Sequence, residues 1–221
     1  MAKAVFVDYT GTLVADMDQN TLEVAERCYK NSSIESVEAM AAYWWKLVKD
    51  YEGKFCGERY ISEDGIVEKI LETCERELGL KENTEELHQL MREFWTHAPV
   101  FSDVRPFLEN CALPVYVLTN IGEKYVAEGL KEKNIQVQGI FCGDMARAYK
   151  PHKEIFETAL KLSGYRRDQV IHVGDSVTSD VKGAKSAGIR PVLVDRKGKL
   201  DCPDTVTVRS LEEIPDLLET F

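Results

Sequence analysis

Polar side chains that could perform chemistry stand directly after short, predominantly apolar runs of the chain. Asp8, Thr119 and Asp175 each follow such a run, the last after an intervening Gly174. Carboxylate and hydroxyl oxygens are hard ligands, and grouped carboxylates repel one another unless a cation is present. If these three side chains meet in the folded protein, their types predict a site that binds a cation.

The same runs predict the strands that would bring these side chains together. Each run is short, rich in β-branched residues and apolar on both faces, as in strands buried on both sides of a sheet. The predicted strands lie at 4–7, 115–118, 170–173 and 191–194. Helical patterns separate them, so the alternation predicts an α/β fold with a doubly wound parallel sheet. Ligands bind such sheets beyond the carboxyl ends of the strands, where all three side chains fall.

The stretch 16–96 follows a different pattern. Its apolar residues recur at helical spacing, and no strand-like run interrupts them. We therefore expect a small helical domain at 16–96, inserted into an α/β core formed by 1–15 and 97–221. A final short strand at 206–208 and a helix at 211–218 complete the predicted core.

Composition and charge exclude several classes of function. The 221 residues include 38 acidic and 28 basic side chains, a formal net charge of −10, so the chain lacks the basic footprint of a nucleic-acid binder. No apolar stretch approaches the roughly 18 residues of a membrane span, and the N-terminus lacks the pattern of a secretory signal. The six cysteines are too widely spaced for a zinc or redox motif. We expect a cytoplasmic protein that binds neither nucleic acid nor membrane; its oligomeric state is unknown from the sequence.

Four motifs occur in a fixed order along the predicted core. They are Asp8-Tyr9-Thr10-Gly11-Thr12-Leu13, Thr119-Asn120, Lys150-Pro151 and Gly174-Asp175-Ser176-Val177-Thr178-Ser179-Asp180. In this order, each after a predicted strand or at a helix start, they resemble the motifs of the haloacid dehalogenase superfamily. The usual glycine-rich patterns of dinucleotide and P-loop sites are missing. The resemblance implies a Rossmann-like core, with the helical stretch 16–96 in the place of a cap domain of the first type.

The resemblance also implies a role for each motif residue. Asp8 would be the nucleophile that takes a phosphoryl group as an aspartyl-phosphate. Mg²⁺ would be held by Asp8, the main-chain carbonyl of Thr10, Asp175 and Asp180. The phosphoryl oxygens would be bound by Lys150, the Thr119 hydroxyl, the main-chain N–H of Asn120 and Gly11. The implied activity is Mg²⁺-dependent hydrolysis of a small phosphorylated metabolite.

Thr10 departs from the pattern of the superfamily. Most of its phosphatases carry an aspartate there, which protonates the leaving group and then activates water. A threonine hydroxyl can do neither near neutral pH, and such general acid–base help is worth about 10²- to 10⁴-fold in rate. We therefore expect faster hydrolysis of aryl and acyl phosphates than of alkyl phosphates, unless His152 or the cap supplies the missing group.

Two other functions are compatible with the motifs. Phosphonoacetaldehyde hydrolases have an alanine at the position of Thr10 and use a cap lysine to form a Schiff base, a role open to Lys54 in a predicted loop between helices. The same loop, with Arg59 and Tyr60, is a candidate for selecting the substrate. Alternatively, the chain is a weakly active relative that binds phosphate-bearing ligands or a protein partner, which Thr10 favours.

Overall fold

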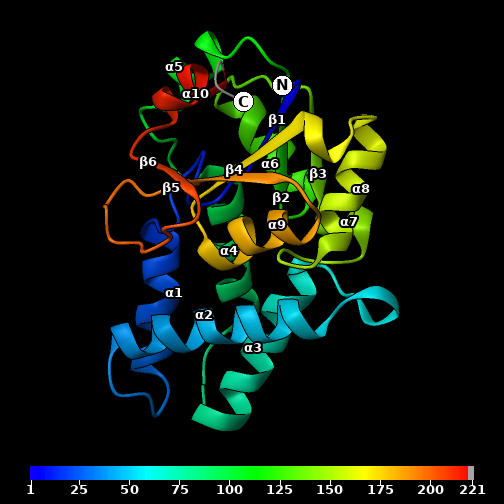
Figure 1. Cartoon of the computed structure of the whole chain (residues 1–221). Helices are drawn as coiled ribbons and strands as arrows, with labels where there is room; N and C mark the ends of the chain where they lie inside the picture. Colours follow the sequence, from blue (N-terminus) through cyan, green and yellow to red (C-terminus); the bar gives the residue numbers. More distant parts are fainter. Residues whose placement is uncertain (219–221) are drawn as a thin grey trace.

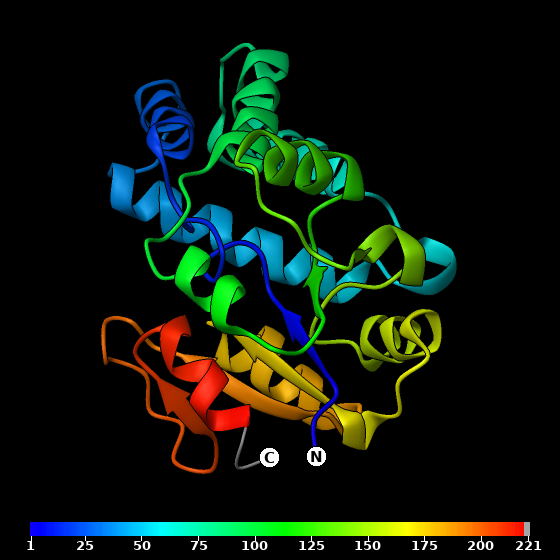
Figure 2. The same ribbon diagram turned by 90° about the horizontal axis from the view of Figure 1, so that it is seen from above.

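The computed structural model describes residues 1–218, whose strands form a six-stranded parallel sheet. The strand order is β3-β2-β1-β4-β5-β6 (Figures 1 and 2). The strands are β1 (Ala4–Val7), β2 (Val115–Thr119), β3 (Gly139–Cys142), β4 (Val170–Gly174), β5 (Arg190–Val194) and β6 (Val206–Val208). The predicted doubly wound α/β sheet is thus confirmed. The edge strand β3 is not among the predicted strands, because it is four residues long, begins with a glycine and is only half buried at its start.

The central strand β1 is apolar on both faces and is buried on both. Val5 and Val7 belong to one hydrophobic core, whereas Ala4 and Phe6 belong to the other. Burial of a large apolar side chain contributes about 1.5–3 kcal/mol to stability. Two cores therefore hold this strand, and they fix the point at which the chain leaves the sheet toward Asp8.

Helices cover both faces of the sheet. One face packs against α5 (Val104–Asn110), α6 (Glu123–Glu132), η4 (Leu211–Glu213) and α10 (Ile214–Leu218). The other face packs against α8 (Lys153–Ser163) and α9 (Gly183–Ser186). Short helical connectors are α7 (Gly143–Ala146), η2 (Arg167–Gln169) and the π-helix η3 (Val177–Lys182). The predicted C-terminal strand and helix are found as β6 and as η4 followed by α10.

The stretch 16–96 is helical, as its periodicity predicts. Its elements are α1 (Gln19–Lys30), α2 (Val37–Lys54), η1 (Gly57–Arg59), α3 (Glu63–Leu78) and α4 (Thr84–His97), which ends one residue beyond the stretch. Main-chain N–H groups at the starts of the four α-helices donate to the side chains of Asp18, Ser36, Ser62 and Asn83. Helices α2 and α3 lie together at the end of the molecule opposite the N-terminus (Figure 1). None of the helices described combines the length and apolar character needed to cross a bilayer.

Candidate active site

Three neighbouring strands bring the predicted site residues to one edge of the sheet. Strand β1 lies between β2 and β4, and all three run in the same direction. Thr119 is the last residue of β2, while Asp8 and Asp175 directly follow β1 and β4. The main-chain N–H of Asp8 donates to the Val173 carbonyl at 2.9 Å. The parallel register therefore places two carboxylates and one hydroxyl at the same edge.

Asp8, Asp175 and Asp180 form a compact group of carboxylates. One oxygen from each lies within 4.8 Å of the others. The Thr12 hydroxyl lies 3.3 Å from an oxygen of both Asp8 and Asp175. Burial, followed by the charges of Asp8 and Asp180, raises the pKa of Asp175 to about 8. A divalent cation would relieve this repulsion, and three carboxylate oxygens are a donor set that suits Mg²⁺.

Lys150 is the positive charge of this group. Its Nζ lies 2.5 Å from Asp8 Oδ1 and 2.7 Å from Asp180 Oδ1, and its side chain is only 3% exposed. Burial alone would lower the pKa of Lys150, but the carboxylates of Asp180 and Asp8 outweigh it and raise that pKa above its ordinary value. The lysine is therefore charged. With all groups ionised, three carboxylates and one ammonium leave a formal charge of −2, which matches a divalent cation.

Asp180 is positioned by the π-helix η3 and by a buried histidine. The Ser176 N–H donates to Asp180 Oδ2 at 3.0 Å, and His172 Nε2 lies 2.8 Å from Oδ1. Burial would raise the pKa of Asp180, but the charge of Lys150 and the hydrogen bond with His172 hold it below its usual range. Sequence reasoning gave His172 no role in the site. No local sequence pattern signals this contact, because it depends on how η3 turns back toward β4.

Two glycines are needed for the carboxylates to come this close. Gly11 has a φ of +85°, and a Cβ atom there would lie 2.4 Å from Asp175 Oδ2. A Cβ atom on Gly174 would lie 2.2 Å from Asp180 Cγ. Gly174 thus permits the close approach of Asp180 to the end of β4. Gly11, which the resemblance assigns to phosphate binding, packs against the metal-ligand candidate Asp175.

Thr119 and Asn120 connect the acidic group to the rest of the site. The Thr119 hydroxyl accepts a hydrogen bond from the Ile121 N–H at 3.1 Å. Asn120 Oδ1 accepts from the Lys150 main-chain N–H at 2.7 Å, and its Nδ2 donates to Glu52 Oε1 on α2 at 2.8 Å. The Asn120 side chain therefore ties the lysine motif to the helical stretch 16–96.

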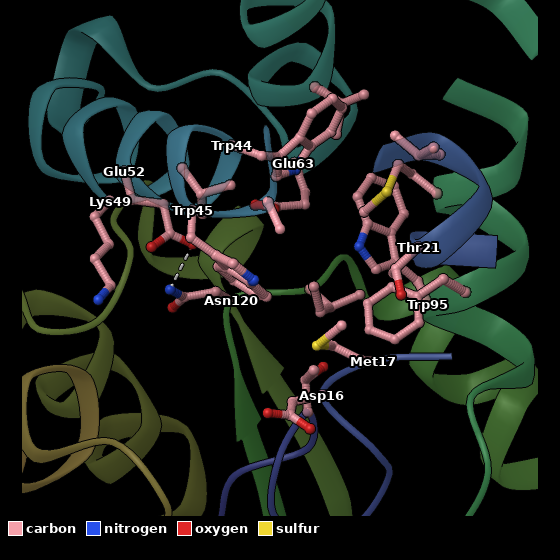
Figure 3. Close-up of a pocket in the computed structure, with 18 of the residues that line it drawn as sticks. Asp16, Met17, Thr21, Trp44, Trp45, Lys49, Glu52, Glu63, Trp95 and Asn120 are labelled. Carbon is pink, nitrogen blue, oxygen red and sulfur yellow. Dashed lines mark hydrogen bonds between the residues drawn. The ribbon is translucent and has the colours of Figure 1, made fainter. Parts of the chain in front are cut away.

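A cavity of about 610 Å³ opens above the carboxylates. Asp8, Thr10, Thr119, Asn120, Lys150, Asp175 and Asp180 line its floor. Its walls come largely from the helices and are mostly apolar, with Met17, Trp44, Trp45 and Trp95 among them (Figure 3). Two acidic side chains of this wall, Glu52 and Glu63, are buried. The site thus combines a charged floor with an apolar chamber large enough for a small organic molecule.

Several residues considered from the sequence lie away from this cavity. Lys54 is the exposed last residue of α2, where its Nζ lies 5.4 Å from the centre of the Phe55 ring, and it does not line the cavity. Neither His152 nor Arg59 nor Tyr60 lines it. The lysine of the 16–96 stretch that does is Lys49 on α2. Sequence reasoning also missed Glu52 and Glu63, since helical periodicity gives no sign that a glutamate faces a cavity.

Comparison with known proteins identifies the family. The sequence profile of the haloacid dehalogenase-like hydrolases matches residues 2–188. The chain therefore belongs to the haloacid dehalogenase-like hydrolases, as its four motifs predict.

Individual relatives differ in their activities. The putative phosphatase YhcW from Bacillus subtilis is 26% identical over 206 residues, which cover 89% of this chain and 85% of that protein. The putative HAD-hydrolase YfnB from Bacillus subtilis, solved bound to magnesium, is 20% identical with a TM-score of 0.72 and 98% of each chain covered. An L-2-haloacid dehalogenase from Xanthobacter autotrophicus is 18% identical with a TM-score of 0.79 and 99% of each chain covered. At such identities these structures share the fold, while the relatives' names include both phosphatases and dehalogenases.

Proposed function

We propose that the protein is a Mg²⁺-dependent phosphohydrolase that cleaves a small phosphate ester through an aspartyl-phosphate on Asp8. The observation that carries this proposal is the group of three carboxylates, two of them buried, and one buried lysine at the strand ends. A bound divalent cation and Lys150 would both stabilise the charge that builds up on the phosphoryl oxygens. The phosphatase among the relatives supports the same reaction.

Each residue has a defined task in the proposed reaction. Asp8 attacks phosphorus, and the bond to the leaving oxygen breaks. Lys150, the Thr119 hydroxyl and the Asn120 main-chain N–H bind the phosphoryl oxygens as charge builds up on them. Asp8, Asp175, Asp180 and the Thr10 carbonyl would hold Mg²⁺, which would supply Lewis-acid stabilisation of the phosphoryl group. Water then releases phosphate from Asp8.

The helical stretch 16–96 acts in this proposal as the cap domain of a core made of 1–15 and 97–221. Its apolar side chains form the cavity wall that contacts the organic part of the substrate. The proposed substrate is therefore a small phosphorylated metabolite with an apolar portion. Closure of the cap over it would exclude water while Asp8 is attacking.

Phosphate release from a panel of phosphate esters tests the proposal, with and without Mg²⁺. We expect Mg²⁺-dependent hydrolysis by the wild type and none by Asp8→Asn, because an amide cannot serve as this nucleophile. Asp195→Asn is the matched control. Asp195 also follows a strand of the sheet, but its Oδ2 accepts the Leu200 N–H at 2.9 Å and it lies outside the cavity. This control should retain activity.

Wild type and both variants should also be assayed with 2-chloropropionate, since a carboxylate nucleophile can also displace halide from carbon. Halide release that needs Asp8 but not Mg²⁺, with no phosphate released from any ester, would replace the proposed function by dehalogenation. Equal phosphate release by wild type and Asp8→Asn would show that another residue carries the reaction.

A further inference from the structure

The proposed reaction needs a proton for the leaving oxygen of an alkyl ester, and Thr10 cannot give one. Thr10 lines the cavity at the position expected of that donor, but its hydroxyl does not ionise near neutral pH. A carboxyl group that faces the cavity from another element could replace it. Glu52 on α2 is such a group.

Glu52 is held beside the residues assigned to the phosphoryl group. Only 8% of it is exposed, and its Oε1 accepts the 2.8 Å hydrogen bond from Asn120 Nδ2, drawn in Figure 3. Asn120 in turn bonds the main chain of Lys150, whose Nζ contacts Asp8. A single side chain therefore separates Glu52 from the lysine motif. Glu52 also lines the cavity, where its side chain can meet a substrate.

We propose that Glu52 is the general acid and base of the hydrolysis, supplied by the helical stretch 16–96 in place of the carboxylate missing at Thr10. This inference rests on the proposed function of the site.

The electrostatic surroundings of Glu52 suit it to act both as a general acid and as a general base. Burial raises the pKa of Glu52 to about 7, although the hydrogen bond from Asn120 and the charge of Lys150 act in the opposite direction. The other groups that interact electrostatically with Glu52 are Asp8, which follows β1, Lys49 from α2 itself, Glu63 from α3 and Tyr149. A carboxyl group that titrates near neutral pH is populated in both its acid and its base forms.

The proton balance of the two steps is simple. As Asp8 attacks phosphorus, the bond from phosphorus to the leaving oxygen breaks and the Glu52 proton moves to that oxygen, which yields the alcohol. The Glu52 carboxylate then takes a proton from water while the water oxygen attacks phosphorus. The bond between phosphorus and Asp8 breaks, phosphate leaves, and Glu52 is protonated again.

A purely structural role for Glu52 would be to tether α2 to Asn120. Glu52→Gln separates the two roles, because glutamine keeps an oxygen that accepts from Asn120 Nδ2 but cannot transfer a proton at neutral pH. If Glu52 is only a tether, the variant should hydrolyse every substrate much as the wild type does, or slow all of them alike.

The experiment measures kcat/KM of wild type and Glu52→Gln on an alkyl phosphate and on 4-nitrophenyl phosphate, whose leaving group needs little protonation. For the alkyl ester we expect a loss of about 100-fold or more, within the range for general acid–base catalysis, and for the aryl ester a loss below about fivefold. The alkaline limb of the alkyl-ester pH profile should also disappear. Retained aryl hydrolysis shows in the same assay that the variant is folded.

Glu63→Gln is the control, because Glu63 is a second buried glutamate of the same cavity wall. Any effect of this variant should be the same on both esters. Equal effects of Glu52→Gln on the two esters would overturn the role of Glu52 and leave the proposed function standing. If the wild type hydrolyses neither ester, the proposed function fails and the inference falls with it.

Discussion

At the scale of single residues, close packing of like charges defines the site. Two of the three carboxylates contact one buried lysine, and glycines 11 and 174 leave the room that a Cβ atom would fill. Such an arrangement costs stability unless a cation is present, which is typical of a functional site. The unusual residue is Thr10, because every other role in the proposed phosphoryl transfer has a candidate residue next to it.

Thr10→Asp tests how the missing carboxylate is replaced. In the Glu52→Gln background we expect this change to raise kcat/KM on an alkyl phosphate by about tenfold, a fraction of full general acid–base catalysis because the surrounding residues are not adapted to it. In the wild-type background the gain should be smaller, since Glu52 already supplies the proton. If Thr10→Asp raises kcat/KM equally in the wild-type and Glu52→Gln backgrounds, an aspartate at position 10 and Glu52 do not perform the same proton transfer.

The sequence could predict the floor of this site but not its wall. Asp8, Thr119 and Asp175 follow apolar runs, and parallel strands must bring such residues to one edge. Glu52 reaches Asn120 across 68 residues of sequence, and His172 meets Asp180 only because η3 turns back toward β4. Neither contact has a local signature. Both depend on how elements pack.

At the scale of elements, α2 and α3 place buried glutamates where no cation of the described chain pairs with them. Glu63 stands in the first turn of α3, and its Oε2 is buried without a hydrogen bond. Burial, together with the charges of Glu52, Asp64 and Asp144, raises the pKa of Glu63 well above its ordinary value. The fold therefore favours the protonated form of Glu63.

The stability of the protein should consequently fall as the pH rises. The folded state keeps a proton on Glu63 that the unfolded chain releases above about pH 4.5, so the free energy of unfolding declines from that pH toward the raised pKa. Glu63→Gln removes this dependence. The free energy of unfolding of the variant should therefore rise relative to that of the wild type as the pH increases from about 5 to about 8.

Urea unfolding at both ends of that pH range measures this difference. Glu75→Gln is the matched control, because Glu75 lies on the same helix but is exposed. It should leave the pH dependence unchanged. If the free energy of unfolding declines with pH equally in wild type and Glu63→Gln, the buried proton does not belong to Glu63.

At the scale of the whole molecule, a charged sheet edge faces an apolar helical wall. Most of the architecture was predictable, since long apolar periodicities and β-branched runs report local structure directly. Strand β3 was not, because a four-residue edge strand that begins with glycine has little periodicity to detect. The location of Lys54 was not predictable either. The helix α2 continues through the residue expected in a loop, so the lysine ends outside the cavity.

Trapping of the phosphoryl group on Asp8 tests the central claim most directly. Wild-type protein with Mg²⁺ and 4-nitrophenyl phosphate is quenched in acid during turnover, digested and analysed by mass spectrometry. We predict one added phosphoryl group on the peptide that contains Asp8, lost when Mg²⁺ is chelated and absent from Asp8→Asn. Steady turnover of the ester with the phosphoryl group on another residue, or an Asp8 adduct that forms equally without a divalent cation, would contradict the account.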